Sequence, residues 1–535
     1  MTRPSPPSPH PSPPASHPSS TSFLRISSPE EIKICDPACG SGHMLTYAFD
    51  LLYAIYEEQG YQATDIPRLI LTNNLYGVEI DPRAGALAAF ALTMKAREKY
   101  RRFLSNGKAV QPNICVLEKI KVDPQELDDY MDKVGRDLFS NGLEGVVHQW
   151  EEADNFGSLI RPLVTDVSDV LELLRERKIG EDLFMANVHQ KVLKALRQAD
   201  YLSPKYHVVV ANPPYMNAKG MNPRLKASLA DWYPNSKADL MAMFMERTAT
   251  LTLERAYWAM INIPTWMFLQ SFAKLRERLI DTQTIESLLH LGRGIFGSDF
   301  GTVAFLVQNA CPSRNNPGVY RRLFEDHVDV RSTEVIEELF RKREYNRFIA
   351  HQSQFELIPG TPFAYWASTA VFRAFESGSR VSDQAEAFRG ISTGDNERFS
   401  RFWHEVSQKN FCTTACSPEE ARKSRKKWFP YNRGGSYRKW YGLGSEIIDY
   451  EDCGARMIAA HENGETPGFR HDGAQGYFYP AITWGALTAG TTSFRKLGCG
   501  FVLGHKGPGL RLDETIADSL LCFLNSNAAP SFWTC

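Results

Sequence analysis

The tetrapeptide Asn212-Pro213-Pro214-Tyr215 has the composition of a site that binds a planar amino group. It directly follows the valine-rich segment 206–211, which predicts a buried strand, and the proline after Asn212 keeps the asparagine backbone extended. The side-chain oxygen of Asn212 and the carbonyl of Pro213 can then both accept hydrogen bonds from one exocyclic amino group, which aims the nitrogen lone pair for attack. Tyr215 offers a ring on which a base can stack. A proline-rich turn with a core tyrosine is the alternative, and the position after a buried strand favours the catalytic interpretation.

A glycine-rich turn is the second candidate site. The segment 36–42 follows a short apolar run and precedes residues with helical spacing (44–59). Glycines let a ligand approach the backbone closely, and a helix N-terminus favours negative charge. The next apolar run (75–80) carries Glu79 near its end, where a carboxylate can accept two hydrogen bonds from ribose hydroxyls. An NAD site is excluded, because residue 45 is leucine and Glu79 lies far beyond the ~20-residue spacing of that fold.

Both motifs lie in an alternating pattern of strands and helices. Short apolar runs precede each motif, and the segments 44–59 and 84–100 have helical periodicity. A mostly helical, charged insertion (about 124–200) separates the two motifs. This alternation predicts a parallel sheet covered by helices on both faces. We therefore expect an α/β catalytic domain over residues 29–345.

The two ends of the chain have different compositions. Residues 4–20 are mainly proline and serine, cannot bury apolar surface, and predict a disordered tail over residues 1–28. After about residue 345 the glycine, aromatic and basic residues increase, which predicts a domain boundary there and a separate region over residues 346–535. The chain stops soon after a predicted helix (517–524), as a truncated domain would.

A basic and aromatic run lies in this C-terminal region. Between Arg422 and Tyr441 there are eight basic residues, six aromatic residues and no acid. Such charges suit DNA phosphates and such rings suit bases, whereas the alternative is an ordinary solvated face. The residues expected to contact DNA are Lys426, Lys427, Trp428, Tyr431, Arg433 and Arg438.

Composition limits the classes of protein to which the chain can belong. Its 535 residues carry 61 Lys and Arg against 62 Asp and Glu, a net charge of −1, so any nucleic-acid site must be a local patch. Ten scattered cysteines do not make a disulfide framework and suggest a reducing cytosol. Cys412 and Cys416 have no convincing second pair for zinc, so we expect no metal site. Without an apolar run of ~18 residues, the chain is expected to be soluble and intracellular, with no membrane partner.

Together the motifs resemble those of amino-group methyltransferases that use S-adenosylmethionine, in the order cofactor motif, catalytic motif, target recognition. From residue 30 to about residue 524 the chain resembles the PglX adenine-specific DNA methyltransferases of BREX phage-defence systems. The phrases Gly-Val-Glu-Ile-Asp-Pro, Val-Ala-Asn-Pro-Pro-Tyr-Met and Lys-Lys-Trp-Phe-Pro-Tyr-Asn-Arg-Gly-Gly carry that resemblance. Proteins of this family are much longer, so we expect the chain to be truncated at both ends.

The resemblance implies a Rossmann-like methyltransferase sheet with a helical insertion, followed by a mixed α+β target-recognition region that is partly present. It implies catalysis by Asn212, Pro213, Pro214 and Tyr215. It implies contacts to S-adenosylmethionine by Asp36, Ala38, Gly40, Gly42, Glu79, Glu118 and Asp239. Asp239 could equally be an acid that stabilises a helix N-terminus. The target base is expected to stack on Tyr215 and Phe296, with Phe300 as the rival ring and core packing as the alternative for either.

Three functions remain open on these grounds. The first is site-specific methylation of adenine N6 in double-stranded DNA, with base flipping, in the bacterial cytoplasm and with other BREX proteins as possible partners. The second is methylation of RNA or of protein glutamine, which the same tetrapeptide allows, although the long basic and aromatic C-terminal region argues against glutamine. The third is a fragment that only binds DNA or other defence proteins. Binding of S-adenosylmethionine separates the first from the third.

Overall fold

The computed structural model describes residues 24–105, 110–135, 143–177, 182–297, 299–312, 317–325, 329–487 and 492–529. Most of the predicted tail (1–28) therefore lies outside the described residues. The chain divides into two compact units between Trp366 and Ala367. Within the described residues, no helix is both long and apolar enough to cross a membrane.

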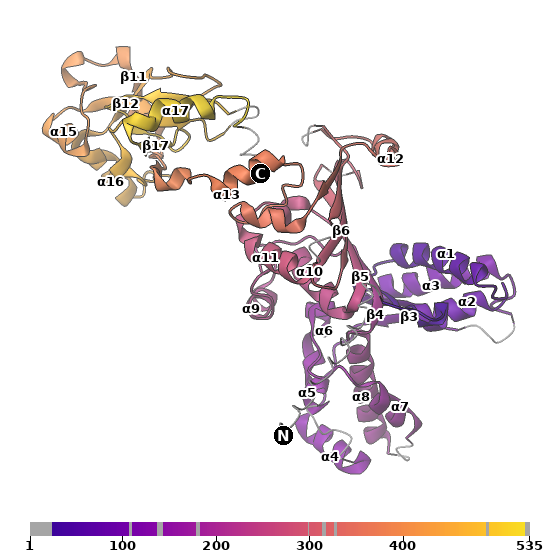
Figure 1. Ribbon diagram of the computed structural model, residues 1–535. Coiled ribbons are helices and arrows are strands. Elements are labelled where there is room, and N and C mark those ends of the chain that lie inside the picture. Colours follow the sequence, from indigo (N-terminus) through magenta and orange to yellow (C-terminus); the bar gives the residue numbers. More distant parts are fainter. Residues whose placement is uncertain are drawn as a thin grey trace, which may run out of the picture. The chain divides into compact units, whose positions relative to one another are not determined.

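A nine-stranded mixed sheet is the centre of the first unit (Figure 1). Its strand order is β3 (Asn113–Val116), β2 (Leu75–Glu79), β1 (Ile34–Asp36), β4 (Tyr206–Ala211), β5 (Thr252–Asn262), β7 (Gly301–Gln308), β6 (Thr284–Arg293), β8 (Gly318–Arg322) and β9 (Arg347–Ala350). The strands from β3 to β5 are parallel, with Ile34 of β1 opposite Leu75 of β2 and Val208 of β4. This half of the sheet agrees with the α/β fold that the sequence predicts.

Two amphipathic helices cover part of the parallel half. Helices α1 (His43–Glu58) and α3 (Pro82–Lys99) pack against each other beside β1 to β3, together with the short α2 (Ile66–Leu69) (Figure 1). Helix α3 begins where the sequence favours it, because Asp81 accepts a hydrogen bond from the amide of Arg83 and Pro82 occupies the first turn. The buried side chains of both helices form one apolar cluster.

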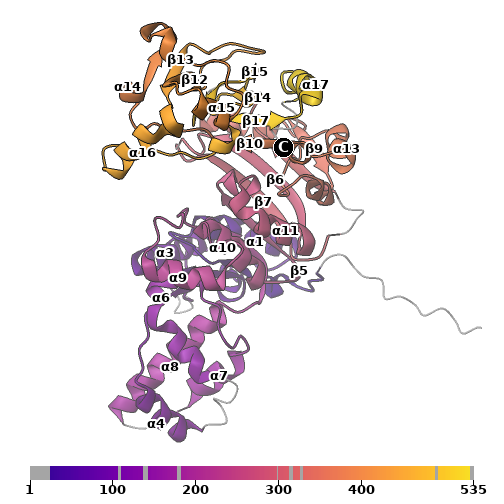
Figure 2. The ribbon, with the colours of Figure 1, turned by 90° about the vertical axis from the view of Figure 1, so that its left-hand side faces the viewer.

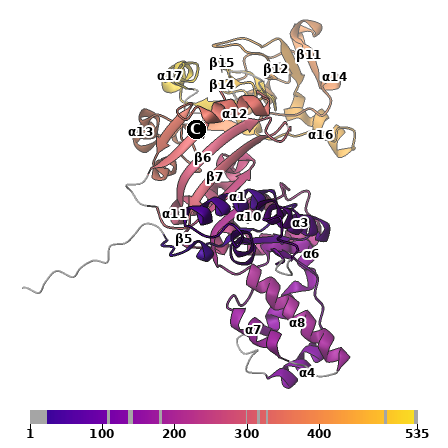
Figure 3. The same ribbon diagram turned by 90° about the vertical axis from the view of Figure 1, so that its right-hand side faces the viewer.

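The other half of the sheet differs from the predicted parallel sheet with two covered faces. Strand β7 pairs antiparallel with both β5 and β6, and β9 pairs antiparallel with β8. Helices α10 (Leu240–Leu251) and α11 (Ala273–Thr282) lie beside this half. A mainly apolar groove of about 430 Å³ opens over β5 to β8, with residues of α1 and α12 (Thr333–Arg341) in its lining. Figure 3 labels the ribbons of β6, β7, α1 and α12. Antiparallel neighbours need no crossover helix, so the chain order does not force a helix onto this face.

A helical insertion separates β3 from β4. It contains α4 (Pro124–Val134), α5 (Leu143–His148), α6 (Ala153–Phe156), α7 (Ser168–Glu176) and α8 (Leu183–Tyr201). Figures 1 and 2 show α4, α7 and α8 together, extending away from the sheet. Asp123 and Asp182 cap α4 and α8, and each accepts a backbone N–H two residues ahead. A helical segment was predicted here from charge and periodicity.

The first unit ends later than the predicted boundary at residue 345. Strand β9 pairs with β8, with Gly318 opposite Ala350, and so completes the large sheet. Farther along, the ring of Tyr365 stacks on that of Tyr320 in β8, at 5.3 Å between centroids. The aromatic and glycine residues that begin near residue 345 therefore belong to the edge of the first core, which corrects the boundary to residue 366.

The second unit is a mixed α+β structure with two four-stranded sheets. One sheet has the order β10 (Ala385–Phe388), β17 (Gly509–Leu512), β14 (Ala481–Trp484) and β15 (Phe494–Leu497). The other has the order β11 (Ser400–Phe402), β13 (Glu446–Asp449), β12 (Trp428–Asn432) and β16 (Val502–Leu503). The helices of this unit are α13 (Thr369–Ser377), α14 (Asn396–Phe399), α15 (Pro418–Lys423), α16 (Ala455–Glu462) and α17 (Glu514–Leu524).

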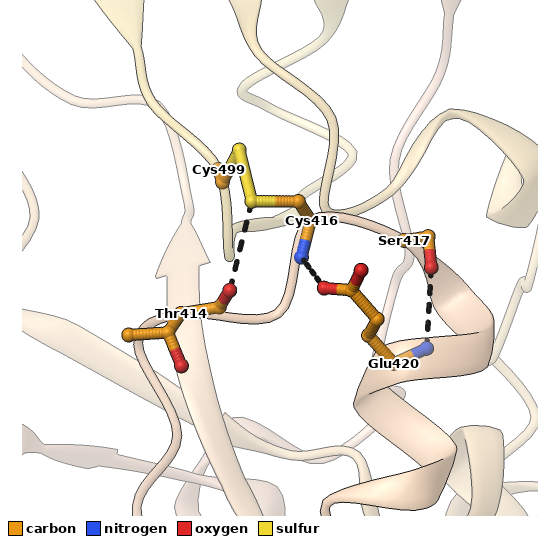
Figure 4. The surroundings of a disulfide bond; sticks show 5 residues. All are labelled: Thr414, Cys416, Ser417, Glu420 and Cys499. Atoms are coloured by element: carbon orange, nitrogen blue, oxygen red, sulfur yellow. Dashed lines mark hydrogen bonds between the residues drawn. A yellow bond between two sulfur atoms is a disulfide. The ribbon is translucent and has the colours of Figure 1, made fainter.

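The second unit contains a disulfide bond that the sequence did not predict. Cys416 is bonded to Cys499, which lies 83 residues later (Figure 4). The amide of Cys416 also donates a hydrogen bond to Glu420 of α15, at 2.8 Å. The sequence paired Cys416 only with its near neighbour Cys412, because a partner this distant is brought close by the fold alone.

Candidate active site

Both sequence motifs lie at the same edge of the large sheet. The glycine turn follows β1, Glu79 ends β2, and Asn212 follows β4, and these three strands are neighbours in the order β2, β1, β4. Because the strands are parallel, their carboxyl ends meet at one edge. Ligands of open α/β sheets bind at this edge.

The glycine turn is held by its own backbone and by Glu79. The amide of Gly40 donates to Glu79 Oε2 at 2.8 Å, the amide of Cys39 donates to the carbonyl of Val78 at 3.0 Å, and the amide of Ala38 donates to Asp36 Oδ1 at 3.0 Å. The turn is therefore hydrogen-bonded to the end of β2.

The two glycines of the turn do different things. Gly40 has a φ of +52°, and no atom lies within 4 Å of the position where a Cβ would stand. This space is where a ligand can approach. Gly42 has a φ of +85°, and a Cβ there would lie 3.1 Å from the Cβ of Ala88 in α3. Gly42 therefore allows close packing against α3, and its contact with a ligand stays a prediction.

Two carboxylates give the turn its electrostatic character. Asp36 is 2% exposed, and burial, with a smaller contribution from the neighbouring Glu79, raises its pKa to about 7. Glu79 Oε1 accepts the amides of Ile80 and Asp81, and Oε2 accepts only that of Gly40 among the hydrogen bonds of the described residues. A carboxylate offers about four lone-pair sites, so Glu79 can still accept a ligand hydroxyl.

Within the tetrapeptide 212–215, the tyrosine is hydrogen-bonded to the asparagine. Asn212 and Pro214 are exposed and Pro213 is buried. The hydroxyl of Tyr215 donates to Asn212 Oδ1 at 2.9 Å and to the carbonyl of Ile261 at 3.3 Å. Burial raises the pKa of Tyr215 to about 12, so its hydroxyl keeps its proton at neutral pH.

Asp239 joins the residue after this tetrapeptide to the start of α10. It caps α10 by accepting the amide of Met241 at 3.1 Å, and it also accepts the amide of Met216 at 3.3 Å. Burial raises the pKa of Asp239. Of its two predicted roles, these contacts are those of the helix N-terminal acid, and its contact with a cofactor stays a prediction.

The second aromatic ring near the tetrapeptide is Phe300. Its ring meets that of Tyr215 edge to face, with 5.8 Å between centroids. Phe296, the ring expected there, is 60% exposed, and no ring contact joins it to Tyr215 among the described residues. The rival ring named from the sequence is thus the one that the structure brings to Tyr215.

Glu118 follows β3 and is already paired. Lys194 of α8 donates to its carboxylate at 2.7 Å, and the side-chain amide of Gln198 donates to its backbone carbonyl at 3.2 Å. The insertion therefore holds Glu118, and a contact between its carboxylate and a cofactor stays a prediction.

Sequence reasoning missed two residues at this edge. Ile80 directly follows Glu79 and is 47% exposed, so it offers an apolar surface beside the carboxylate. An apolar residue after an acid at a strand end is a signal that could have found it. Ser158 of the insertion donates to the carbonyl of Pro37 in the glycine turn. Nothing in the sequence distinguishes this serine from the others.

Several residues of the basic run are less available for contact with DNA than the sequence predicts. Tyr431 is 3% exposed in the core of the unit, so a base cannot stack on it, which corrects that assignment. Lys427 lies 3.6 Å from Asp449, and Arg433 lies 3.1 Å from Glu446. Strand β13 thus supplies acids that the run itself lacks.

The remaining predicted contacts of the run are also partly engaged. The ammonium of Lys426 donates to the carbonyl of Lys409. Trp428 is half-buried and lies under the ammonium of Lys427, 5.3 Å from its ring centroid. The backbone amide of Arg438 donates to the hydroxyl of Ser493 at 2.9 Å, and the guanidinium takes no part in this bond.

The exposed rings of the run lie farther along, at Tyr437, Trp440 and Tyr441, of which Tyr441 is 78% exposed. The backbone of Trp440 is fixed to β15, because its amide donates to Phe494 and its carbonyl accepts from Lys496, both at 2.9 Å. These rings are therefore presented on an ordered loop. Among the described residues, no cluster of three or more His, Cys, Asp or Glu is placed to hold a metal ion.

The chain is similar to several known proteins. Residues 73–296 match the Eco57I restriction-modification methylase family. The chain is 34% identical over 529 residues to the adenine-specific methyltransferase BrxX of Escherichia coli O9:H4 (strain HS), covering 93% of this chain and 42% of that protein. It is 35% identical over 524 residues to the adenine-specific methyltransferase PglX of Lacticaseibacillus casei (strain Zhang), covering 94% of this chain and 42% of that protein.

A solved structure of the type IIL restriction-modification enzyme MmeI in complex with DNA is similar with a TM-score of 0.49 and 12% identity, covering 92% of this chain and 58% of that one. The resemblance and the fold class expected from the sequence are confirmed by the family match and by the two sequence relatives. The chain spans less than half the length of those relatives.

Proposed function

Because this chain is homologous over nearly its whole length to PglX and BrxX adenine-specific methyltransferases, we propose that it transfers a methyl group from S-adenosylmethionine to N6 of adenine in double-stranded DNA. We place this activity in a BREX-type phage-defence system, where other defence proteins are its partners. The single observation that carries the proposal is the meeting of three strand ends, which joins the glycine turn, Glu79 and Asn212 at one edge.

The residues of the turn fit the proposed cofactor. The space at Gly40 admits a ligand against the backbone, the free lone pair of Glu79 accepts a ribose hydroxyl, and Ile80 offers an apolar surface for an adenine ring. Asp36, once ionised, suits the cationic amino group of the methionine part. When bound, S-adenosylmethionine supplies a methyl group on a positively charged sulfur.

Asn212 and Pro213 prepare the target amine. Their two oxygens accept the two amino protons, so the nitrogen lone pair is held toward the methyl carbon. The nitrogen forms its bond to that carbon as the carbon–sulfur bond breaks, and one amino proton then passes to water. The hydroxyl of Tyr215 already donates to Asn212 Oδ1, and the second lone pair of that oxygen can accept the amine.

The target base has to leave the duplex, because its amino group is paired there. Tyr215 and Phe300 provide the aromatic surface for the flipped base. On the second unit, the exposed rings Tyr437, Trp440 and Tyr441, with Arg438 and Lys426, are the proposed DNA contacts.

The experiment is methyl transfer by the purified chain, with calorimetry of S-adenosylmethionine binding alongside. We expect transfer to adenine-containing duplex DNA and none to duplex already methylated at N6. Asn212→Ala should abolish transfer and leave cofactor binding unchanged, whereas Asn187→Ala, on the exposed face of α8, should match the parent.

Transfer by Asn212→Ala within about tenfold of the parent rate, a barrier change of only ~1.4 kcal/mol, would contradict the catalytic assignment. Transfer to RNA or to a glutamine peptide in preference to DNA would replace the substrate. Cofactor binding without transfer to any of these acceptors would favour a binding fragment.

A further inference from the structure

A buried arginine that has no acidic partner among the described residues lies at the junction between the insertion and the sheet. Arg247 of α10 is 3% exposed, and burial lowers its pKa. Its guanidinium donates to the carbonyl of Ser158 at 2.8 Å, to the carbonyl of Leu202 at 2.7 Å and to the hydroxyl of Thr250 at 2.9 Å. The charge is therefore used to fix backbone carbonyls, and one of them belongs to Ser158.

Ser158 reaches from the insertion to the glycine turn. It lies in the 3-10 helix Gly157–Leu159 and is itself buried. Its hydroxyl donates to the carbonyl of Pro37 at 2.5 Å, and Pro37 stands between Asp36 and Ala38. Arg247 thus holds the backbone of Ser158, and the side chain of Ser158 holds the turn.

The same short segment also contacts the rest of the site. A Cβ at Gly157 would lie 3.0 Å from Cγ2 of Ile80, so this backbone lies against the residue after Glu79. The hydroxyl of Tyr233, between the catalytic tetrapeptide and α10, donates to the carbonyl of Leu159 at 2.7 Å. The insertion therefore meets both the cofactor turn and the segment that follows the tetrapeptide.

We propose that Ser158 is a positioning residue, through which the helical insertion holds the glycine turn in its cofactor-binding conformation. This inference rests on the proposed function. Ser158 acts through Pro37 and does not take part in the chemistry. Its hydrogen bond fixes the peptide between Asp36 and Ala38, and so orders the turn before a ligand arrives.

Loss of the hydroxyl leaves the buried carbonyl of Pro37 without this donor, so the turn becomes less ordered in the free chain. Binding must then order it, which weakens affinity for S-adenosylmethionine. We expect Ser158→Ala to raise the dissociation constant roughly 5- to 30-fold, the effect of one or two kcal/mol. The KM for DNA and the kcat at saturating cofactor should stay at the parent values.

The test uses the full chain and a matched set of variants. Ser158→Thr and Ser158→Val introduce side chains of similar volume, and valine has a methyl group where threonine has its hydroxyl. The Thr variant should therefore bind the cofactor more tightly than the Val variant, even if Ser158→Ala folds poorly. Ser203→Ala is the control, since Ser203 is buried nearby and its hydroxyl bonds only the carbonyl of Ala199 among the hydrogen bonds of the described residues. Calorimetry gives the affinity, and hydrogen exchange of the amides at 38–42 reports the order of the turn without cofactor.

Faster exchange at 38–42 and weaker cofactor binding in Ala and Val, with Thr close to the parent, is the expected result. Equal affinities of Thr and Val, or equal losses in Ser158→Ala and Ser203→Ala, would overturn the positioning role and leave the proposed function standing. A parent chain that does not bind S-adenosylmethionine would overturn the positioning role and the proposed function together. Unchanged hydrogen exchange in Ser158→Ala would overturn the positioning role by itself.

Discussion

The phenol of Tyr215 donates a hydrogen bond to the side-chain oxygen of Asn212, at 2.9 Å. The two residues proposed to contact the target base are therefore hydrogen-bonded to each other, and the oxygen that should accept an amino proton already accepts one hydrogen bond. Because an amide oxygen has two lone pairs, Asn212 Oδ1 can accept an amino proton of the base beside the Tyr215 hydroxyl or in its place.

Tyr215→Phe should keep the ring for stacking and remove the hydroxyl that donates to Asn212 Oδ1. We expect methyl transfer at saturating DNA to be equal to or faster than in the parent. Tyr215→Ala should instead weaken productive DNA binding, because stacking on one base contributes ~1–3 kcal/mol. Steady-state kinetics with both variants measures this. A Phe variant as impaired as the Ala variant would show that the hydroxyl, and not the ring, is what the site uses.

Glu79→Ala should weaken binding of S-adenosylmethionine, since hydrogen bonds to a charged group contribute roughly 1.5–3 kcal/mol each. The variant also removes the acceptor of the Gly40 amide. Glu118→Gln is the comparison, because Lys194 already engages the carboxylate of Glu118, and we expect it to change the affinity less. Calorimetry decides between them, and an unchanged dissociation constant for Glu79→Ala would remove Glu79 from the site.

Asp36 should make stability depend on pH. Burial raises its pKa from 3.8 to about 7, so the folded chain binds more protons than the unfolded chain between these values. The contribution of Asp36 to the free energy of unfolding therefore decreases as pH rises from about 4 to about 7 and is constant above. Asp36→Asn lacks this titration, so its stability relative to the parent should increase over that range. Urea unfolding at several pH values would contradict this if the difference between the two proteins did not change.

Tyr441→Ala should weaken DNA binding and leave its salt dependence unchanged, because stacking releases few counterions. Lys426→Ala is the counterpart, and should flatten the slope of log affinity against log salt by about one unit if its ammonium meets a phosphate. Salt titrations by fluorescence anisotropy measure both.

Tyr431→Ala should lower thermal stability, since its ring is in the core. We therefore assign a structural role to Tyr431 and a DNA contact to Tyr441. If both variants lowered DNA affinity equally and left thermal stability unchanged, that assignment would be wrong.

Local patterns were sufficient for the parallel half of the fold. The valine-rich segment predicted β4 with the bounds that the structure has, Tyr206–Ala211, and the apolar spacing predicted α1 and α3 to within two residues at each end. These elements are specified by residues that are close together in the sequence. The pairings β7 with β5 and β9 with β8 are not, because antiparallel partners are chosen by the whole sheet.

The sequence by itself determined which chemical groups the site contains: a glycine turn after a strand, an acid at the next strand end, and Asn-Pro-Pro-Tyr after a third. Only the tertiary structure decided which of these groups are free. It buried Tyr431, set Asp449 beside Lys427, bonded Cys416 to Cys499, and brought Ser158 to Pro37. Residue types and short spacings are local properties that the sequence displays directly. Burial, charge pairing and hydrogen bonding between distant segments depend on which segments come into contact. Those contacts are set by packing of the complete fold.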